Sequence, residues 1–529
     1  SSLQGVRLAA EMAGIGAMPA GSAPRGSWMN RFYRHIRSRP LGQVIAVPEC
    51  TGGTAGRRTI RRRANALSLA LLFSVLGNAP AHAQSFWSGG AGDWFDPGNW
   101  TAGVPDAGDT AIVNNGGTAQ IGAAGAVSGI GLAGETAGNS GTIEVDGAGS
   151  TWTIGNTLYV GNSGTGTLDV TNGGAVSNHN GAIGTTATGS GTVTVDGAGS
   201  TWTNGGQLTI GEHGSGILDI TSGGVVSNTL AIIANQAGSS GDVTVDGAGS
   251  EWNFSSNLAV GNSGDATLAI SDGGAVSNVD GLVGYFAAGS SAVTVDGADS
   301  IWTNSGELYI GVWGGATLGI TGGGAVSNTI GHIGRHDTGD GEVTVSGANS
   351  TWTNSDWLHV GHSGTGELTV ENGGAVENVI GLIGSAADSA GTVTVRDADS
   401  IWTNTNNMAV GYSGDGTLTI EAGGAVINVQ GFVGDQSTAT GFATVTGAGS
   451  TWTNSGLFAV GNFGDGTLDI LDGGVVSNTT GHIGRIADGS GEVVRRAETA
   501  LEPGTADLEG VGRLDRIGLV ERCGDRARQ

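Results

Sequence analysis

The sequence predicts an all-β protein, a single-stranded parallel β-helix (β-solenoid) with about 25 residues per coil. Three observations support this fold class. A tryptophan recurs every 50 residues in variants of the motif GAGSTWTN, each 50-residue unit divides into two similar halves, and each half contains short alternating runs separated by glycine. The repeated tryptophans are Trp152, Trp202, Trp252, Trp302, Trp352, Trp402 and Trp452.

The two halves of one unit align within residues 158–206. GTLDV (166–170) aligns with GTVTV (191–195), and GGAVSN (173–178) aligns with AGSTWTN (198–204). Alternation over three to five residues with glycine at the corners indicates strand, turn and strand. Such short strands bury their apolar side only when successive coils stack. A seven-bladed β-propeller is the alternative for this period, but a blade is not two copies of one coil.

The repeated tryptophan alternates with threonines, so we expect it to point into the core. Its counterpart in the other half is a valine, which predicts a column of alternating large and small side chains. An outward tryptophan column, the alternative, would offer a carbohydrate-binding surface. The valines are Val176, Val226, Val276, Val326, Val376, Val426 and Val476.

An asparagine follows two residues after each valine and after most of the tryptophans. We expect these asparagines at corners, where they tolerate left-handed dihedral angles and their stacked amides hydrogen-bond along the axis. Phe254 interrupts the second column. The asparagines are Asn178, Asn228, Asn278, Asn328, Asn378, Asn428 and Asn478, and Asn204, Asn304, Asn354, Asn404 and Asn454.

Charge is distributed unevenly along the chain. Residues 84–494 contain 38 acidic residues and three arginines, a formal charge of −35. Phosphate groups are bound largely by lysine and arginine, so anionic membrane surfaces are poor partners and no nucleic-acid partner is expected. Both cysteines, Cys50 and Cys523, lie outside this span. The repeats must therefore be stabilised by stacking and not by disulfides.

Residues 57–83 have the pattern of a secretory signal peptide. Five arginines precede an apolar run, residues 64–76, which is too short to cross a bilayer, and the segment ends in Ala81-His82-Ala83. We expect cleavage between Ala83 and Gln84.

The segment MNRFYRHIRSRPLGQVIAVPE, at 29–49 within the upstream region 29–56, resembles the extended signal peptide region of autotransporter (type V secretion) proteins. SRP replaces the usual apolar-aromatic middle of that region. The resemblance implies that Met29 is the natural start and that residues 1–28 are an upstream extension.

The pattern LxVGxSGxGTLxIxxGGAVSN followed by GSGxVTVDGAGSTWTNSG covers residues 141–494. It is similar to the repeat of type V secretion and PEP-CTERM-associated proteins, seen most often in autotransporter passengers. Residues 86–116 resemble the Trp-rich opening of such arrays, so 84–140 is expected to form an amino-terminal cap and first coils. The resemblance implies export by the Sec machinery and passage through an outer-membrane translocator barrel. Display at the cell surface or secretion would follow.

The alternating pattern stops after Val494. Residues 495–529 contain seven arginines and are expected to be an aberrant tail, frameshifted or truncated, with a short helical cap as the alternative. The strands of a translocator barrel are absent from this sequence. The expected destination of this chain alone is the periplasm.

Three groups of residues in the sequence are candidates for a catalytic or metal site. Ser163, Ser263, Ser363 and Ser413 stand in GxSG sequences, but His213, Trp313 and Phe463 take the same place elsewhere, which predicts an exposed turn and no protease. The carboxylates are expected to be dispersed, which argues against a glycosidase or lyase. His332, His336, His359 and His362 are expected to be surface histidines, with a zinc site as the alternative.

We therefore expect no catalytic, cofactor-binding or metal-binding residue and no cofactor. The expected function is that of an adhesin or structural interaction protein whose repeated faces contact host, matrix or sister-cell surfaces. The alternative is an enzyme carried on the β-helix, either a polysaccharide lyase or hydrolase or a protease. Threonine pairs such as Thr192/Thr194 and Thr201/Thr203 also resemble ice-binding solenoids, but Glu251 and Ile301 interrupt that pattern.

Overall fold

The computed structural model describes residues 83–286, 289–486 and 489–496. In these ranges the chain forms 49 β-strands and one short 3-10 helix, η1 (Pro97–Asn99). The predicted segments 1–28 and 29–56, nearly all of 57–83, and all of the tail beyond residue 496 lie outside the described residues. No helix among the described residues is long and apolar enough to cross a membrane.

Each coil contributes one strand to each of three sheets. A typical coil consists of β13 (Ser190–Asp196), β14 (Thr201–Asn204) and β15 (Gln207–Ile210). Sheet 1 contains β2, β4 and every third strand from β7 to β49, 17 strands in all. Sheet 2 contains 15 strands, every third from β5 to β47, and sheet 3 contains 17, namely β1 and every third strand from β3 to β48. The predicted β-solenoid is confirmed.

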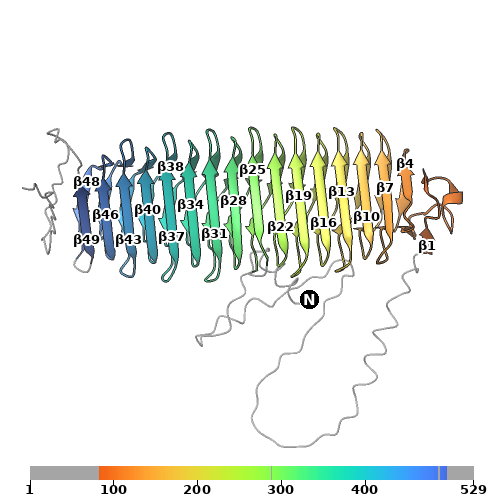
Figure 1. The fold of residues 1–529 in the computed structure, drawn as a ribbon, viewed down its shortest axis with the longest axis horizontal. Helices are drawn as coiled ribbons and strands as arrows, with labels where there is room; N and C mark the ends of the chain where they lie inside the picture. Colours follow the sequence, from red (N-terminus) through yellow and green to blue (C-terminus); the bar gives the residue numbers. More distant parts are fainter. Residues whose placement is uncertain (1–82, 287–288, 487–488, 497–529) are drawn as a thin grey trace, which may run out of the picture. The chain divides into compact units, whose positions relative to one another are not determined.

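The strands of each sheet pair in parallel with their counterparts in the coils before and after. In sheet 1, β13 pairs with β10 (Thr165–Thr171) and with β16 (Ser215–Thr221), residue against residue at a spacing of 25. Figure 1 shows the sheet 1 strands from β4 to β49 side by side in chain order. The propeller alternative is wrong, because strands pair across coils and do not form separate blades.

The first and last strands of the three sheets mark the two ends of the solenoid. Sheet 1 runs from β2 (Ala91–Asp93) to β49 (Ser490–Arg496). Sheet 2 runs from β5 (Ala126–Ser128) to β47 (Val475–Ser477). Sheet 3 begins at β1 (Ala83–Phe86) and ends at β48 (Thr480–Ile483).

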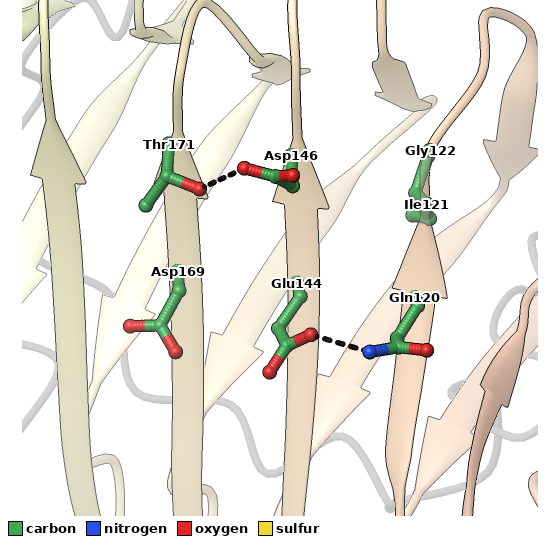
Figure 2. A pocket seen from close by; sticks show the side chains of 7 residues that line it. All are labelled: Gln120, Ile121, Gly122, Glu144, Asp146, Asp169 and Thr171. Carbon is green, nitrogen blue, oxygen red and sulfur yellow. Dashed lines mark hydrogen bonds between the residues drawn. The ribbon is translucent and has the colours of Figure 1, made fainter.

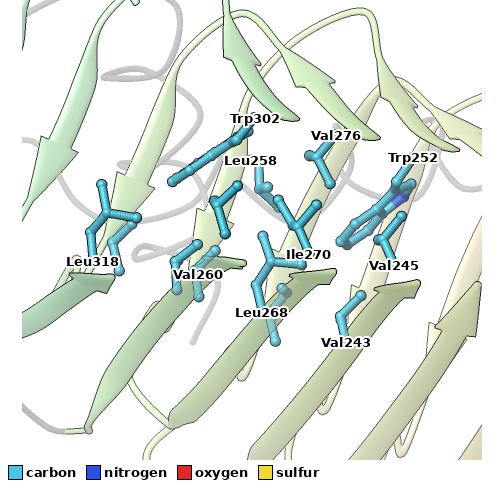
Figure 3. Close-up of a cluster of buried hydrophobic side chains, with 14 of the residues drawn as sticks. Val243, Val245, Trp252, Leu258, Val260, Leu268, Ile270, Val276, Trp302 and Leu318 are labelled. Atoms are coloured by element: carbon cyan, nitrogen blue, oxygen red, sulfur yellow. The ribbon is translucent and has the colours of Figure 1, made fainter. Parts of the chain in front are cut away.

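The core contains the predicted column of alternating large and small side chains. Val176 of β11 (Ala175–Asn178) pairs with Trp152 in the coil before it and with Trp202 in the coil after it. All seven repeated tryptophans are fully buried. Figure 3 shows the same alternation at Trp252, Val276 and Trp302. The prediction that tryptophan points inward is confirmed, and an outward carbohydrate-binding column is excluded.

Sheets 1 and 3 supply the remaining core side chains by strict alternation. Val193 and Val195 of β13 are buried, as are Leu208 and Ile210 of β15. Because side chains on a strand alternate between its two faces, the residues between them are directed away from this core.

The asparagines following valine and tryptophan end strands of sheet 2 and are buried, except Asn478, which lies just beyond β47 and is partly exposed. Nδ2 of Asn178 donates to Oδ1 of Asn204 at 2.5 Å, which confirms the predicted axial amide bond. The expectation of left-handed backbone at these asparagines is wrong. That conformation occurs instead at corner residues such as Asn172, with φ of 53°.

The serine and glycine residues of the repeat form the corner between sheets 1 and 2. The hydroxyl of Ser200 donates to the carbonyl oxygen of Asp196 at 2.6 Å and accepts from the N–H of Gly173, one coil earlier, at 3.0 Å. Gly174 allows two coils to approach closely, because a Cβ there would lie 2.2 Å from the carbonyl oxygen of Val145. The serine and glycines of the repeat are therefore structural.

Three further tryptophans form a cluster that reaches the first repeated one through Trp94. Trp87, Trp94 and Trp100 are buried, and the indole N–H of Trp100 donates to the carbonyl oxygen of Trp94 at 2.8 Å. The rings of Trp94 and Trp152 are 5.2 Å apart. Residues 87–100 thus continue the aromatic core beyond the first repeat.

Candidate functional site

The side chains left for contact with other molecules are those that point outward from the sheets. On sheet 1 the central outward position is threonine in five successive coils, in register from strand to strand. We call this row the threonine ladder. It is formed by Thr344, Thr369, Thr394, Thr419 and Thr444.

The ladder lies on five consecutive strands of sheet 1. All five threonines are partly exposed, and parallel strands stand about 4.8 Å apart. The row is therefore a regular, rigid line of hydroxyl and methyl groups. The strands are β31 (Asp340–Ser346), β34 (Thr365–Glu371), β37 (Ala390–Arg396), β40 (Asp415–Glu421) and β43 (Thr440–Thr446).

Hydrogen bonds between coils also fix other outward side chains of sheet 1. The hydroxyl of Thr221 donates to Oδ1 of Asp196 at 2.6 Å, one coil earlier. Thr192 and Thr194 are partly exposed on β13, as the alternation predicted. The outer face of sheet 1 is thus an ordered polar surface.

A depression of about 440 Å³ lies near the amino-terminal end of sheet 1 (Figure 2). Its side chains come from three neighbouring coils, and Glu144 stands beside Asp169 in register. The expectation that carboxylates are dispersed is wrong here, because a separation of 25 residues places them on adjacent strands. The lining residues are Gln120, Ile121, Gly122, Glu144, Asp146, Asp169 and Thr171.

The carboxylates of this depression differ in their surroundings. Partial burial raises the pKa of Asp169 above its usual value, and the charge of Glu144 adds to the rise, while a hydrogen bond with Thr194 opposes it. Hydrogen bonds from Thr171 and Asn172 lower the pKa of Asp146. All the charged residues that line the depression are acidic, so the site repels anions.

The GxSG serines lie in the turn that joins sheet 3 to sheet 1. Ser163, Ser363 and Ser413 are half-buried, whereas Ser263 is buried, so the expectation of an exposed turn is wrong for Ser263. The hydroxyl of Ser163 accepts a hydrogen bond from that of Thr186 in the next coil, at 3.1 Å. This serine links neighbouring coils.

Sheet 3 carries the strongest departure from the repeat. In β27 (Leu308–Ile310), β30 (Gly331–Ile333) and β33 (Trp357–Val360), the position facing away from the core is Tyr309, His332 and His359 in turn. The three rings stack nearly parallel, each 4.9 Å from the next. His332 is 5% exposed and His359 is 7% exposed, so the surface-histidine prediction is wrong for both.

His362, in the turn after β33, completes a cluster with these two histidines. Nδ1 of His332 lies 3.1 Å from Nδ1 of His362, and Nδ1 of His359 lies 3.0 Å from the hydroxyl of Ser385. The three residues offer nitrogen atoms that all lie within 4.8 Å of one another, so the group could hold a metal ion. His336, which the sequence grouped with them, stacks instead on Trp313 at 3.7 Å.

Burial keeps the histidine cluster uncharged. It lowers the pKa of His332, lowers that of His359 to about 2 and lowers that of His362 to about 3. A hydrogen bond with His332, 3.2 Å from its Nε2 to Oε2 of Glu307, is the main reason that the pKa of Glu307 falls to about 2. At neutral pH, three neutral imidazoles therefore stand beside one carboxylate.

The separation of two histidines in the sequence is the signal from which their contact could have been predicted. His332 and His359 are 27 residues apart, the distance between paired positions of β30 and β33. Because the two histidines occupy the same position in successive coils, their contact could have been predicted. The burial could not be predicted, because it depends on how the turns pack against sheet 3.

The predicted cleavage bond between Ala83 and Gln84 lies at the start of β1, where both residues are exposed. Cleavage there stays a prediction.

No protein-family model and no curated protein matches the chain. Among solved structures it is similar to one described as the crystal structure of a TibC-catalyzed hyper-glycosylated TibA55-350 fragment. The two are 16% identical with a TM-score of 0.36, over 69% of this chain and 99% of that one. At this identity and score the similarity carries no argument about function.

Proposed function

We propose that the chain is the exported passenger of an autotransporter-type protein and acts as an adhesive or structural shaft. The observation that carries the proposal is the outer face of sheet 1, where outward side chains stand in register along 17 paired parallel strands and one position is threonine in five successive coils. The threonine ladder is its most regular part. Cell-surface or extracellular display is the location that suits such a face.

Repetition of the same side chain along the sheet allows many weak contacts to give strong binding together. A partner that touches one threonine meets the same group about 4.8 Å further along, and linked contacts give an avidity well above that of each alone. The strands that carry these side chains are already paired, so little conformational entropy is lost when a partner binds to the face. The face therefore suits an extended partner, such as a polysaccharide or a protein surface.

The negative charge of the repeats limits the kinds of partner that can bind. Residues 84–494 carry a formal charge of −35, which opposes binding to anionic polymers and keeps neighbouring copies apart. Neutral polar surfaces on host, matrix or sister cells remain as partners.

The resemblance of residues 29–49 and 141–494 to autotransporter sequences supports the export route. Residues 84–494 contain no cysteine, and each coil of a solenoid contacts mainly its neighbours. A chain that crosses the outer membrane unfolded can therefore form one coil at a time. The route requires the Sec machinery and a translocator barrel supplied from outside the present sequence.

Charge substitution on sheet 1 tests the adhesive face. Residues 84–494, displayed from an outer-membrane barrel, would carry Thr369→Arg and Thr394→Arg. The matched control carries Thr353→Arg and Thr403→Arg on sheet 2. We expect attachment to surfaces to fall with the first pair alone, at equal display. Equal attachment by both variants would contradict the assignment of sheet 1 as the adhesive face.

A further inference from the structure

We propose that His332, His359 and His362 bind one divalent transition-metal ion, with zinc as the representative. The site lies on the outward column of sheet 3 and is separate from the adhesive face on sheet 1. It would occur once in the array, at the place where the repeated residues give way to histidine.

The spacing of the nitrogen atoms suits such an ion. Zinc lies about 2.0–2.1 Å from imidazole nitrogen in tetrahedral sites, which places two ligand atoms about 3.3 Å apart. Nδ1 of His332 and Nδ1 of His362 are 3.1 Å apart. The third nitrogen, from His359, lies within 4.8 Å of the others. Binding of an ion would draw the nitrogen of His359 closer to the other two.

Hydrogen bonds to neighbouring residues engage one ring nitrogen of His332 and one of His359, so the other ring nitrogen of each can bind the ion. Nε2 of His332 lies 3.2 Å from Oε2 of Glu307, so its N–H is directed at the carboxylate and its Nδ1 keeps a lone pair. Glu307 is held in turn by the hydroxyl of Tyr309. Nδ1 of His359 lies 3.0 Å from the hydroxyl of Ser385, so we assign the other ring nitrogen, Nε2, to the ion. Metal-binding histidines usually have such a partner on the second nitrogen.

The ligand set selects the class of metal. Imidazole suits zinc, copper and nickel, whereas calcium and magnesium prefer oxygen ligands. Three histidines leave one coordination position for water or another donor.

One nearby charge opposes the ion. The guanidinium of Arg335 lies 5.7 Å from the centre of the Tyr309 ring and contributes to the low pKa of all three histidines. Glu307, 3.2 Å from Nε2 of His332, offsets this charge. Removal of the Arg335 charge should therefore strengthen metal binding.

A bound ion would fasten two successive coils of the solenoid. His332 belongs to β30, whereas His359 and His362 belong to β33 and the turn that follows it. Glu307, one coil before His332, links a third coil through its hydrogen bond. In an array without disulfides, this ion would be a local cross-link and would raise resistance to unfolding.

The test uses the full chain after treatment with a chelator, titrated with Zn²⁺ and, as a visible probe, with Co²⁺. We expect one tightly bound ion per chain and a tetrahedral Co²⁺ spectrum. His362→Asn should abolish both, and Glu307→Gln should weaken binding by about 10- to 100-fold. Arg335→Gln should strengthen it. His213→Asn, in an exposed turn of another coil, is the matched control and should change nothing.

Two results would overturn the proposal. One is wild-type binding no tighter than that of His362→Asn. The other is a Co²⁺ spectrum of the octahedral, hydrated kind. If His362→Asn fails to fold, the opposite effects of Glu307→Gln and Arg335→Gln on affinity decide the matter, and equal affinities would reject the site.

Discussion

The indole N–H of Trp202 donates a hydrogen bond of 2.7 Å to Oδ1 of Asn178, which lies one coil earlier. Asn178 in turn donates to Asn204, two residues after that tryptophan. The same bond joins Trp302 to Asn278 at 2.7 Å. Since the donor belongs to one half of the unit and the acceptor to the other, each tryptophan needs a neighbouring coil of the other kind. This pairing gives a physical reason for a 50-residue period built from two unequal 25-residue coils.

Truncation of a core tryptophan should melt the coils around it. Trp302 is fully buried, and the loss of a buried indole costs about 3–5 kcal/mol. We expect Trp302→Ala to create new protease cleavage sites near residue 300, mapped by mass spectrometry. Ser363→Ala, in a half-buried turn, should leave the pattern unchanged. Equal tolerance of the two changes would be inconsistent with a stacked tryptophan core.

Removal of the amide between two coils should destabilise them without opening a large cavity. Asn278→Ala leaves the N–H of Trp302 and Oδ1 of Asn304 without their present partner. An unsatisfied buried polar group costs about 1–3 kcal/mol. Denaturant unfolding should show this loss, while Asn406→Ala, at an exposed position, should not. A neutral Asn278→Ala would mean that these buried bonds contribute little to stability.

The pKa of Asp169 in the depression should depend on the charge of Glu144. Burial, and then the charge of Glu144, hold the pKa of Asp169 above its unfolded value. An acid with a raised folded pKa destabilises the fold at high pH, and this penalty disappears as pH falls through the folded pKa. Glu144→Gln should lower the pKa of Asp169, measured by NMR titration. It should also reduce the stability gained on acidification. An unchanged pKa would rule out the coupling.

Export should remove the signal peptide at one bond. Amino-terminal sequencing of exported protein should give Gln84 as the first residue, because Ala81-His82-Ala83 has the small residues required at a cleavage site. Recovery of an intact amino terminus in the membrane would contradict the assignment.

Most of the fold could be predicted from the sequence, because the 50-residue period makes each core position visible seven times. The pairing of Val176 with Trp202 followed from alignment of the two halves. The backbone conformation at Asn178 did not follow from the sequence. An asparagine that is buried as a hydrogen-bond acceptor and one that stands at a corner give the same sequence pattern. The pair Glu144–Asp169 was missed, and the histidines at 332 and 359 were grouped but wrongly placed at the surface, since each pair is separated by about one coil and occurs in one place only.

The most direct test of the central proposal, that adhesion is distributed over repeated faces, is a series of in-phase deletions in residues 84–494 displayed from an outer-membrane barrel. Removal of residues 190–239, for example, joins Gly189 to Ser240, which stands two coils on in the register of Ser190. A 12-residue deletion from the same point should break the stack and serves as the control for folding.

Cell aggregation and surface attachment would be measured for each 50-residue deletion at equal display. We expect activity to fall gradually with the number of units removed and to depend little on which unit is lost. Loss of all activity on removal of one particular unit, with the others nearly intact, would contradict the adhesive account. It would place a single site, as an enzyme requires, in that unit.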